Sequence, residues 1–148
     1  MRTIVLTISA YFPMSHRRVG DKTNFESSIE NKIKLHTIRA NYRYWKKQID
    51  QVIEGKAELS IREWTGKPYN SPQKELFRLT KDDGVGIEKL HFEKTIFYPW
   101  VGEKAVNYID LAENDGLVEA DFLSWFRKYP LDDPMAIIHF THFRYNKA

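Results

Sequence analysis

The stretch TNFESSIENKIKLHTIR, residues 23–39, carries the strongest local signals in this chain. Thr23 and Glu26 have the spacing of a capping box, in which the two side chains bond free backbone amides at the start of a helix. Phe25, Ile29 and Ile33 recur every four residues, which is the spacing of one helix face. We therefore expect a capped helix at the beginning of this stretch.

The six residues at the end of the stretch, Lys34 to Arg39, combine an amine, a hydroxyl and a guanidinium. We expect the helix to fail around residues 31–32 and residues 36–39 to run extended. In a strand, Thr37 and Arg39 point to one face, and His36 and Ile38 point to the other. Ordinary helix or strand surfaces do not need this combination, whereas sites that bind or cut nucleotide-like molecules often do.

Length and composition indicate a single globular domain. The chain has 148 residues, of which 42% are hydrophobic and 29% charged, within the range of folded domains. It has no cysteine, which excludes a disulfide framework, a zinc ribbon and a cysteine nucleophile, and fits a cytoplasmic location. Residues 3–9 alternate threonine with β-branched residues and predict a first strand, not a signal peptide. No run approaches the roughly 20 apolar residues of a membrane span, so we expect no membrane partner.

Charge is unevenly distributed along the chain. Between His16 and Lys47 there are nine Lys or Arg against three acidic residues, whereas residues 81–148 hold eight basic and twelve acidic residues. A basic first third suggests an anionic partner near residues 34–39, although a solvated basic helix face explains the charge equally well.

Further elements follow from periodicity and turn residues. A second amphipathic helix is predicted at 42–53, ending at Gly55, and strands are predicted at 57–64 and 74–81. The Asp-Asp-Gly turn at 82–84 predicts a hairpin into a strand at 85–92. A loop is expected around residues 99–102, residues 105–112 are ambiguous, residues 119–128 predict a short helix, and residues 135–143 predict a final strand. This order predicts an α+β fold whose sheet is a mixed or antiparallel barrel, with two N-terminal helices and one late helix.

Other motifs are interpreted as structural. His139 and His142 face opposite ways on a strand, so we expect one core and one surface residue and no metal site. Residues 82–86 lack the lysine of a phosphate loop, and Asp132 and Asp133 are expected in a solvated turn.

The helix followed by Lys34-Leu35-His36-Thr37-Ile38-Arg39 resembles the Lys-x-x-Thr-x-Arg signature of the ASCH (activating-signal-cointegrator homology) domain, a branch of the PUA-like superfamily of small β-barrels. The glycine that usually precedes the lysine is absent. Downstream, residues 111–117 and the following aromatic helix resemble the family's Ala-x-x-Glu-Gly element, with Asp115 where many members carry glutamate. Residues 136–140 are similar to the closing strand. The resemblance implies one ASCH/PUA-like domain over residues 1–148, with an elaborated middle at about 53–100.

The resemblance implies two functions for these residues. In ASCH-like folds the lysine, the threonine and the acidic residue meet in a crevice beside the barrel, and some members deacetylate N4-acetylcytidine-type nucleosides. The catalytic residues would then be Lys34, Thr37 and Asp115, with Thr37 as the nucleophile. Lys34 needs a lowered pKa for this role, because a solvated lysine has a pKa of about 10.4. The shorter arm of Asp115 is the weakest element of this hypothesis.

Binding without catalysis demands less of the site and is our first expectation. It would place RNA or a modified nucleoside in a basic crevice formed by Lys34, Thr37, Arg39, Trp64, Lys67 and Tyr69, with bases stacking on the rings and no cofactor or metal. Trp45 fits the apolar face of its helix and is expected in the core. A protein-binding adaptor is a third possibility, which predicts a broad exposed apolar patch instead of a polar pocket. The sequence leaves the oligomeric state open.

Overall fold

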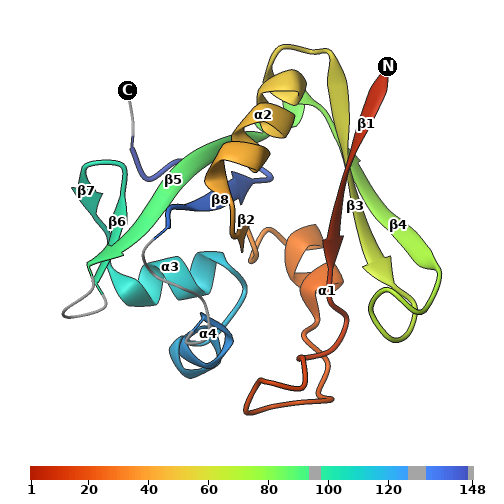
Figure 1. Cartoon of the computed structure of the whole chain (residues 1–148), viewed down its shortest axis with the longest axis vertical. Helices are drawn as coiled ribbons and strands as arrows, with labels where there is room; N and C mark the ends of the chain where they lie inside the picture. Colours follow the sequence, from red (N-terminus) through yellow and green to blue (C-terminus); the bar gives the residue numbers. More distant parts are fainter. Residues whose placement is uncertain (94–97, 127–132, 147–148) are drawn as a thin grey trace.

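Two β-sheets form the framework of the protein (Figure 1). A computed structural model describes residues 1–93, 98–126 and 133–146. The three-stranded sheet has the order β1-β3-β4 and consists of β1 (Arg2–Ile8), β3 (Ala57–Trp64) and β4 (Gln73–Leu79), with β1 and β3 parallel. The five-stranded sheet has the order β2-β8-β5-β6-β7, is antiparallel throughout, and consists of β2 (His36–Arg39), β5 (Gly86–Glu93), β6 (Tyr98–Val101), β7 (Lys104–Ala105) and β8 (Met135–His139).

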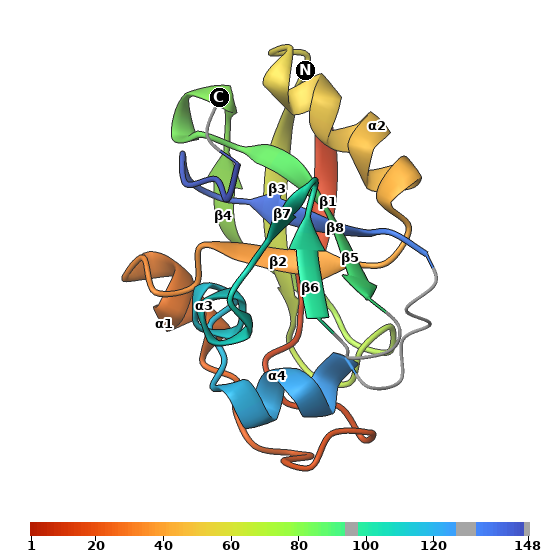
Figure 2. The same ribbon diagram turned by 90° about the vertical axis from the view of Figure 1, so that its left-hand side faces the viewer.

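Helices pack around these sheets. The described helices are α1 (Phe25–Glu30), α2 (Tyr42–Ile53), the short 3₁₀ helix η1 (Lys81–Asp83), α3 (Tyr108–Asn114) and α4 (Glu119–Phe126). Helix α2 contacts β3, β5 and β8, while α4 lies at the opposite end of the molecule, next to α3 (Figures 1 and 2). Buried apolar side chains from both sheets and from all four α-helices form one core cluster. No helix in the described ranges is both long enough and apolar enough to cross a bilayer.

Several predicted elements are confirmed. The first strand, the extended residues 36–39 and the two strands between residues 57 and 81 form where the patterns placed them. The final strand also forms, but it ends at His139, four residues before the predicted end. Helix α2 ends two residues before Gly55, which adopts the left-handed conformation at φ 79° that favours glycine. Trp45 packs against the core. The mixed α+β class is therefore confirmed, although Lys128, the predicted end of the last helix, lies outside the described residues.

The predicted capping box at the first helix is wrong. Asn24, and not Thr23, is the N-cap residue of α1, and the Asn24 side chain forms no capping hydrogen bond. The Thr23 Oγ1 accepts a long bond of 3.4 Å from the Phe25 amide. The Thr23 hydroxyl instead donates to the Ser9 carbonyl at 2.7 Å, so it ties the preceding loop to the end of β1. Ile33 lies beyond the helix and is 60% exposed.

The predicted hairpin at residues 82–84 is also wrong. Thr80 and Asp83 form a capping box at η1, and the chain then leaves the three-stranded sheet, because β5 pairs with β6 and β8. The loop expected around residues 99–102 is partly strand β6, and the ambiguous segment contains α3. There are thus two late helices where one was predicted.

The described strands do not form the closed barrel that was predicted. β1 is an edge of the smaller sheet and β2 an edge of the larger one, and no backbone ladder joins them in the described ranges. A side chain connects these edges, since the Arg39 guanidinium on β2 donates to the Thr7 carbonyl of β1.

Candidate ligand-binding site

A small cavity lies where the edges of the two sheets meet α4. Its volume is about 270 Å³, and its walls come from the end of β1, from β2, from the end of β3 with the following loop, and from the α3–α4 region. We call it the β2 crevice; the residues in it that carry polar or aromatic groups include Lys34, Thr37, Arg39, Trp64, Tyr69 and Asp115. Segments far apart in the sequence therefore converge on one concave surface.

Lys34 is held rigidly in this crevice. Its side chain is buried, and its ammonium Nζ donates to the Asp115 carbonyl at 2.7 Å and lies 3.3 Å from the Asp115 Oδ1. The same nitrogen lies 4.2 Å from the centre of the Phe25 ring, a favourable cation–π distance. Burial lowers the pKa of Lys34, with Asp115 opposing this effect and the nearby charge of Arg39 adding to it. The shorter aspartate arm therefore reaches the lysine.

Thr37 and Arg39 lie on one face of β2, as the alternation predicted. The Arg39 guanidinium donates to the Thr37 Oγ1 at 2.7 Å and to the Ile38 carbonyl at 3.0 Å. Since the Thr37 oxygen accepts this bond, its own hydrogen remains available to donate. A guanidinium bound to this oxygen also favours negative charge developing on it.

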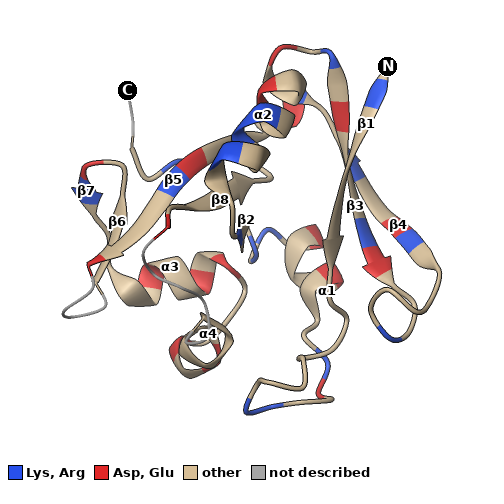
Figure 3. Ribbon diagram, viewed as in Figure 1, with Lys and Arg blue, Asp and Glu red and all other residues tan. Residues whose placement is uncertain are grey.

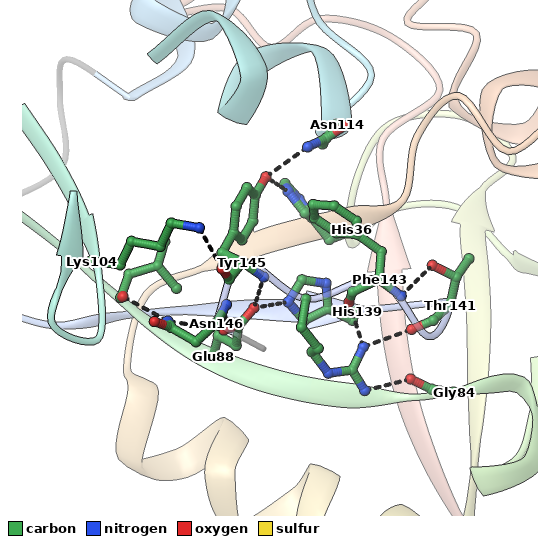
Figure 4. Close-up of polar contacts among 12 residues, drawn as sticks. His36, Gly84, Glu88, Lys104, Asn114, His139, Thr141, Phe143, Tyr145 and Asn146 are labelled. Atoms are coloured by element: carbon green, nitrogen blue, oxygen red, sulfur yellow. Dashed lines mark hydrogen bonds and ion pairs between the residues drawn. The ribbon is translucent and has the colours of Figure 1, made fainter. Parts of the chain in front are cut away.

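His36 extends the site on the opposite side of Asp115, and no sequence pattern predicted a role for it. Its ring is buried, with Nδ1 at 3.2 Å from the Asp115 Oδ1 and Nε2 at 2.6 Å from the Tyr145 hydroxyl. Figure 4 shows this hydroxyl also receiving a bond from Asn114, at 3.1 Å. Burial lowers the pKa of His36 against the opposing effect of Asp115. The network therefore assigns the proton to Nδ1, which donates to the carboxylate, while Nε2 accepts from Tyr145.

A second pair, the buried His139 and the partly buried Glu88, supports Tyr145. Glu88 accepts bonds from His139 Nε2 at 2.8 Å and from the Tyr145 amide at 2.8 Å (Figure 4). Burial alone would raise the pKa of Glu88, but these bonds and two from Asn146 outweigh it and lower the pKa to about 2. Burial lowers the pKa of His139 to about 4. His139 is buried and His142 exposed, as predicted.

The aromatic residues predicted for the site lie at its mouth. The rings of Trp64 and Tyr69 are 5.1 Å apart, and Tyr69 is 84% exposed. Lys67 lies in the same loop and is exposed, but it is not among the residues that line the crevice. Its carbonyl instead receives bonds from Asn70 and Ser71 within the loop.

No family model, curated protein or solved structure matches this chain. The resemblance to the ASCH domain rests on the sequence motifs, and any function must be argued from the geometry of the crevice. Within the described ranges, no three His, Asp or Glu side chains are grouped so that they could hold a metal ion.

Proposed function

We propose that the β2 crevice binds a nucleobase, presented by RNA or by a modified nucleoside. The observation that carries this proposal is the convergence of Lys34, Thr37, Arg39 and Asp115 on one cavity whose mouth holds Trp64 and Tyr69. Donors and acceptors inside a concave site suit the polar edge of a base, and the half-buried Trp64 ring and the exposed Tyr69 ring suit its faces. A volume of about 270 Å³ is just below the roughly 300–1,000 Å³ of typical small-molecule pockets, so it suits one base and not a larger ligand.

The same proposal includes the fold family. We take the chain as an ASCH-type, PUA-like domain in which the barrel is completed by side chains where the two sheets meet. The bond from Arg39 to the Thr7 carbonyl supports this reading, because it links edge strands of the two sheets at the crevice. The pairing of β2 with β8 also supports it, because these are the two strands that carry the family-like motifs.

Titration of cytidine, N4-acetylcytidine and short single-stranded RNA tests base binding. Stacking of one base on an aromatic ring contributes about 1–3 kcal/mol, so Tyr69→Ala should weaken binding by about fivefold to a hundredfold. Tyr44→Ala is the matched control, because Tyr44 is also an exposed tyrosine but lies on α2 outside the crevice lining. Equal effects of the two substitutions, or none, would remove the support for base binding at this site.

Hydrolysis of an N4-acylcytidine is a second candidate, favoured by the lowered pKa of Lys34 and its contact with Asp115. The Thr37 Oγ1 would attack the acyl carbon while its proton passes to Lys34, which must first lose its own ammonium proton, as its lowered pKa favours. The bond from carbon to the exocyclic nitrogen then breaks, and that nitrogen takes the proton. Water finally hydrolyses the ester on Thr37, which regenerates the hydroxyl and releases the acid.

Chromatography of N4-acetylcytidine after incubation with the protein separates the two candidates. Hydrolysis requires that Thr37→Val abolish product formation, that Thr37→Ser retain part of it, and that the exposed Thr65→Val control leave it unchanged. Saturable binding of N4-acetylcytidine by the wild-type protein without release of cytidine contradicts the hydrolase and leaves the binding function standing.

A further inference from the structure

A second, larger concavity lies beyond the end of strand β2 and collects positive charge. Its volume is about 750 Å³, and it lies between the start of α2, β5 and the segment that leads into β8. We call it the α2 groove; its charged lining residues are Arg43, Lys46, Lys47, Lys89 and Asp133. Figure 3 shows Lys and Arg segments along α2 and on β5 beside it. Four cations therefore face one carboxylate.

Most of this charge is available to a ligand. Arg43, Lys46 and Lys47 follow one another at helical spacing, so they share one face of α2 with about 5–6 Å between neighbouring Cβ atoms. Lys46 is paired with Asp50 at 2.6 Å. Arg43, Lys47 and Lys89 are exposed and form no ion pair with any residue in the described ranges. The Lys89 Nζ lies 5.1 Å from the centre of the Tyr42 ring, which places this cation on the groove wall.

The groove begins where strand β2, which lines the crevice, ends. Arg39 lines the crevice, and the next residue, Ala40, lines the groove, so the two backbone positions are about 3.8 Å apart. Neighbouring phosphates of a nucleotide strand with one base in the crevice would then reach the cations of α2. A flat membrane surface does not fit into a concave groove of this kind, and the exposed cations along its wall suit the phosphates of a strand that lies in it.

We propose that the α2 groove binds the phosphate backbone of a single-stranded nucleic acid whose base occupies the β2 crevice. This inference rests on the proposed function and specifies its ligand: the preferred partner is a strand with phosphates and not a free nucleoside. Arg43, Lys47 and Lys89 are the principal phosphate contacts. Each phosphate neutralised by such a contact releases condensed counterions, so binding depends on salt.

The test uses the full chain and a fluorescently labelled single-stranded RNA of about twelve nucleotides, titrated at several salt concentrations. The groove variant is Arg43→Gln combined with Lys47→Gln and Lys89→Gln. Each phosphate contact contributes roughly 0.7 to the slope of log K against log salt for a single strand, so loss of three contacts should reduce the slope by about 2. Binding near 0.1 M salt should then weaken by about a hundredfold. The control variant carries Lys56→Gln, Lys74→Gln and Lys81→Gln, three exposed lysines outside the groove, so it has the same net charge.

The outcomes separate the groove from the crevice. Unchanged affinity and slope in the groove variant, or an equal change in the control variant, would overturn the groove assignment. If the groove variant loses as much affinity for a poly-glutamate peptide as it loses for RNA, the assignment of nucleic acid as the ligand is overturned. Cytidine should bind equally well to the wild type and to the groove variant, because cytidine has no phosphate. If cytidine does not bind at all, while RNA binding still depends on salt in the wild type and loses this dependence in the groove variant, the crevice proposal is contradicted and the groove proposal is not.

Discussion

Substituting Gly116 by alanine should disturb the crevice through Lys34. Gly116 has φ 80°, and a Cβ built on it would lie 3.0 Å from the Lys34 Cβ, 3.2 Å from its Cγ and 3.3 Å from its Cδ. The lysine stem has little room to move, because it is buried and its ammonium is bound to Asp115. Gly116→Ala therefore imposes both a left-handed alanine and an overpacked contact.

Gly20→Ala separates these two costs. Gly20 has a similar φ of 86°, but a Cβ there would meet no atom within 4 Å. A left-handed alanine costs about 1–2 kcal/mol in either variant, and overpacking of a buried contact adds about 1–3 kcal/mol in Gly116→Ala alone. Gly116→Ala should thus lose about 2–5 kcal/mol in total.

Urea unfolding of both variants measures their free energies of unfolding, and their midpoints can be compared directly if the m-values are equal. Gly116→Ala should also weaken nucleoside binding, whereas Gly20→Ala should leave it unchanged. Equal losses of stability in the two variants, within about 0.5 kcal/mol, together with equal nucleoside binding, would show that Gly116 does not fix the Lys34 stem.

Acid should destabilise the protein through His139 and Glu88. The pKa of His139 is about 4 in the folded protein, against an ordinary 6.5. As the pH falls through this range, the unfolded chain binds a proton at His139 before the folded protein does, so the free energy of unfolding should fall. Glu88 has a pKa of about 2 against an ordinary 4.5 and extends this loss of stability to lower pH. Urea midpoints measured from neutral pH to about pH 3 check this, and Glu88→Gln should flatten the acid end of the curve. Tyr145→Phe should cost about 1–3 kcal/mol, because the buried His36 Nε2 loses its partner. Tyr98→Phe, at an exposed position of β6, should cost almost nothing, and thermal melts compare the two variants.

Local patterns predicted the elements that depend on local chemistry. Helix α2 formed between the residues that its apolar spacing and Gly55 indicated, because amphipathic periodicity and a left-handed glycine act over a few residues. The apolar final strand was equally clear, since all five residues of β8 are buried.

Two predictions were wrong because the same local pattern is compatible with more than one structure. A threonine three residues before a glutamate fits a capping box, yet the Thr23 hydroxyl bonds the Ser9 carbonyl, fourteen positions away in the sequence. The Asp-Asp-Gly turn fits a hairpin, yet it ends a short 3₁₀ helix that sends β5 to the other sheet. Both choices depend on contacts between distant segments, which short-range spacing does not encode.

Local patterns likewise predicted only some of the residues of the site. The hexapeptide and the family resemblance singled out Lys34, Thr37 and Asp115, and the structure brings them to one crevice. His36 lies within the same hexapeptide, but its role depends on Tyr145, which belongs to no motif in the sequence. Only the fold places these two residues together.

Asp115 shows why a shorter side chain can serve at this position. One methylene fewer than glutamate removes about 1.5 Å of reach, which by itself predicts a gap between the carboxylate and the lysine. The gap does not form, because Gly116 has no side chain and the Lys34 stem packs directly against it, so that the ammonium meets both the carbonyl and the carboxylate of Asp115. His36 holds the same carboxylate oxygen from the other side. The reach of the acidic residue is therefore set jointly by the glycine that follows it and by the histidine opposite, and a Gly116 substitution should affect the site as strongly as a change in the carboxylate itself.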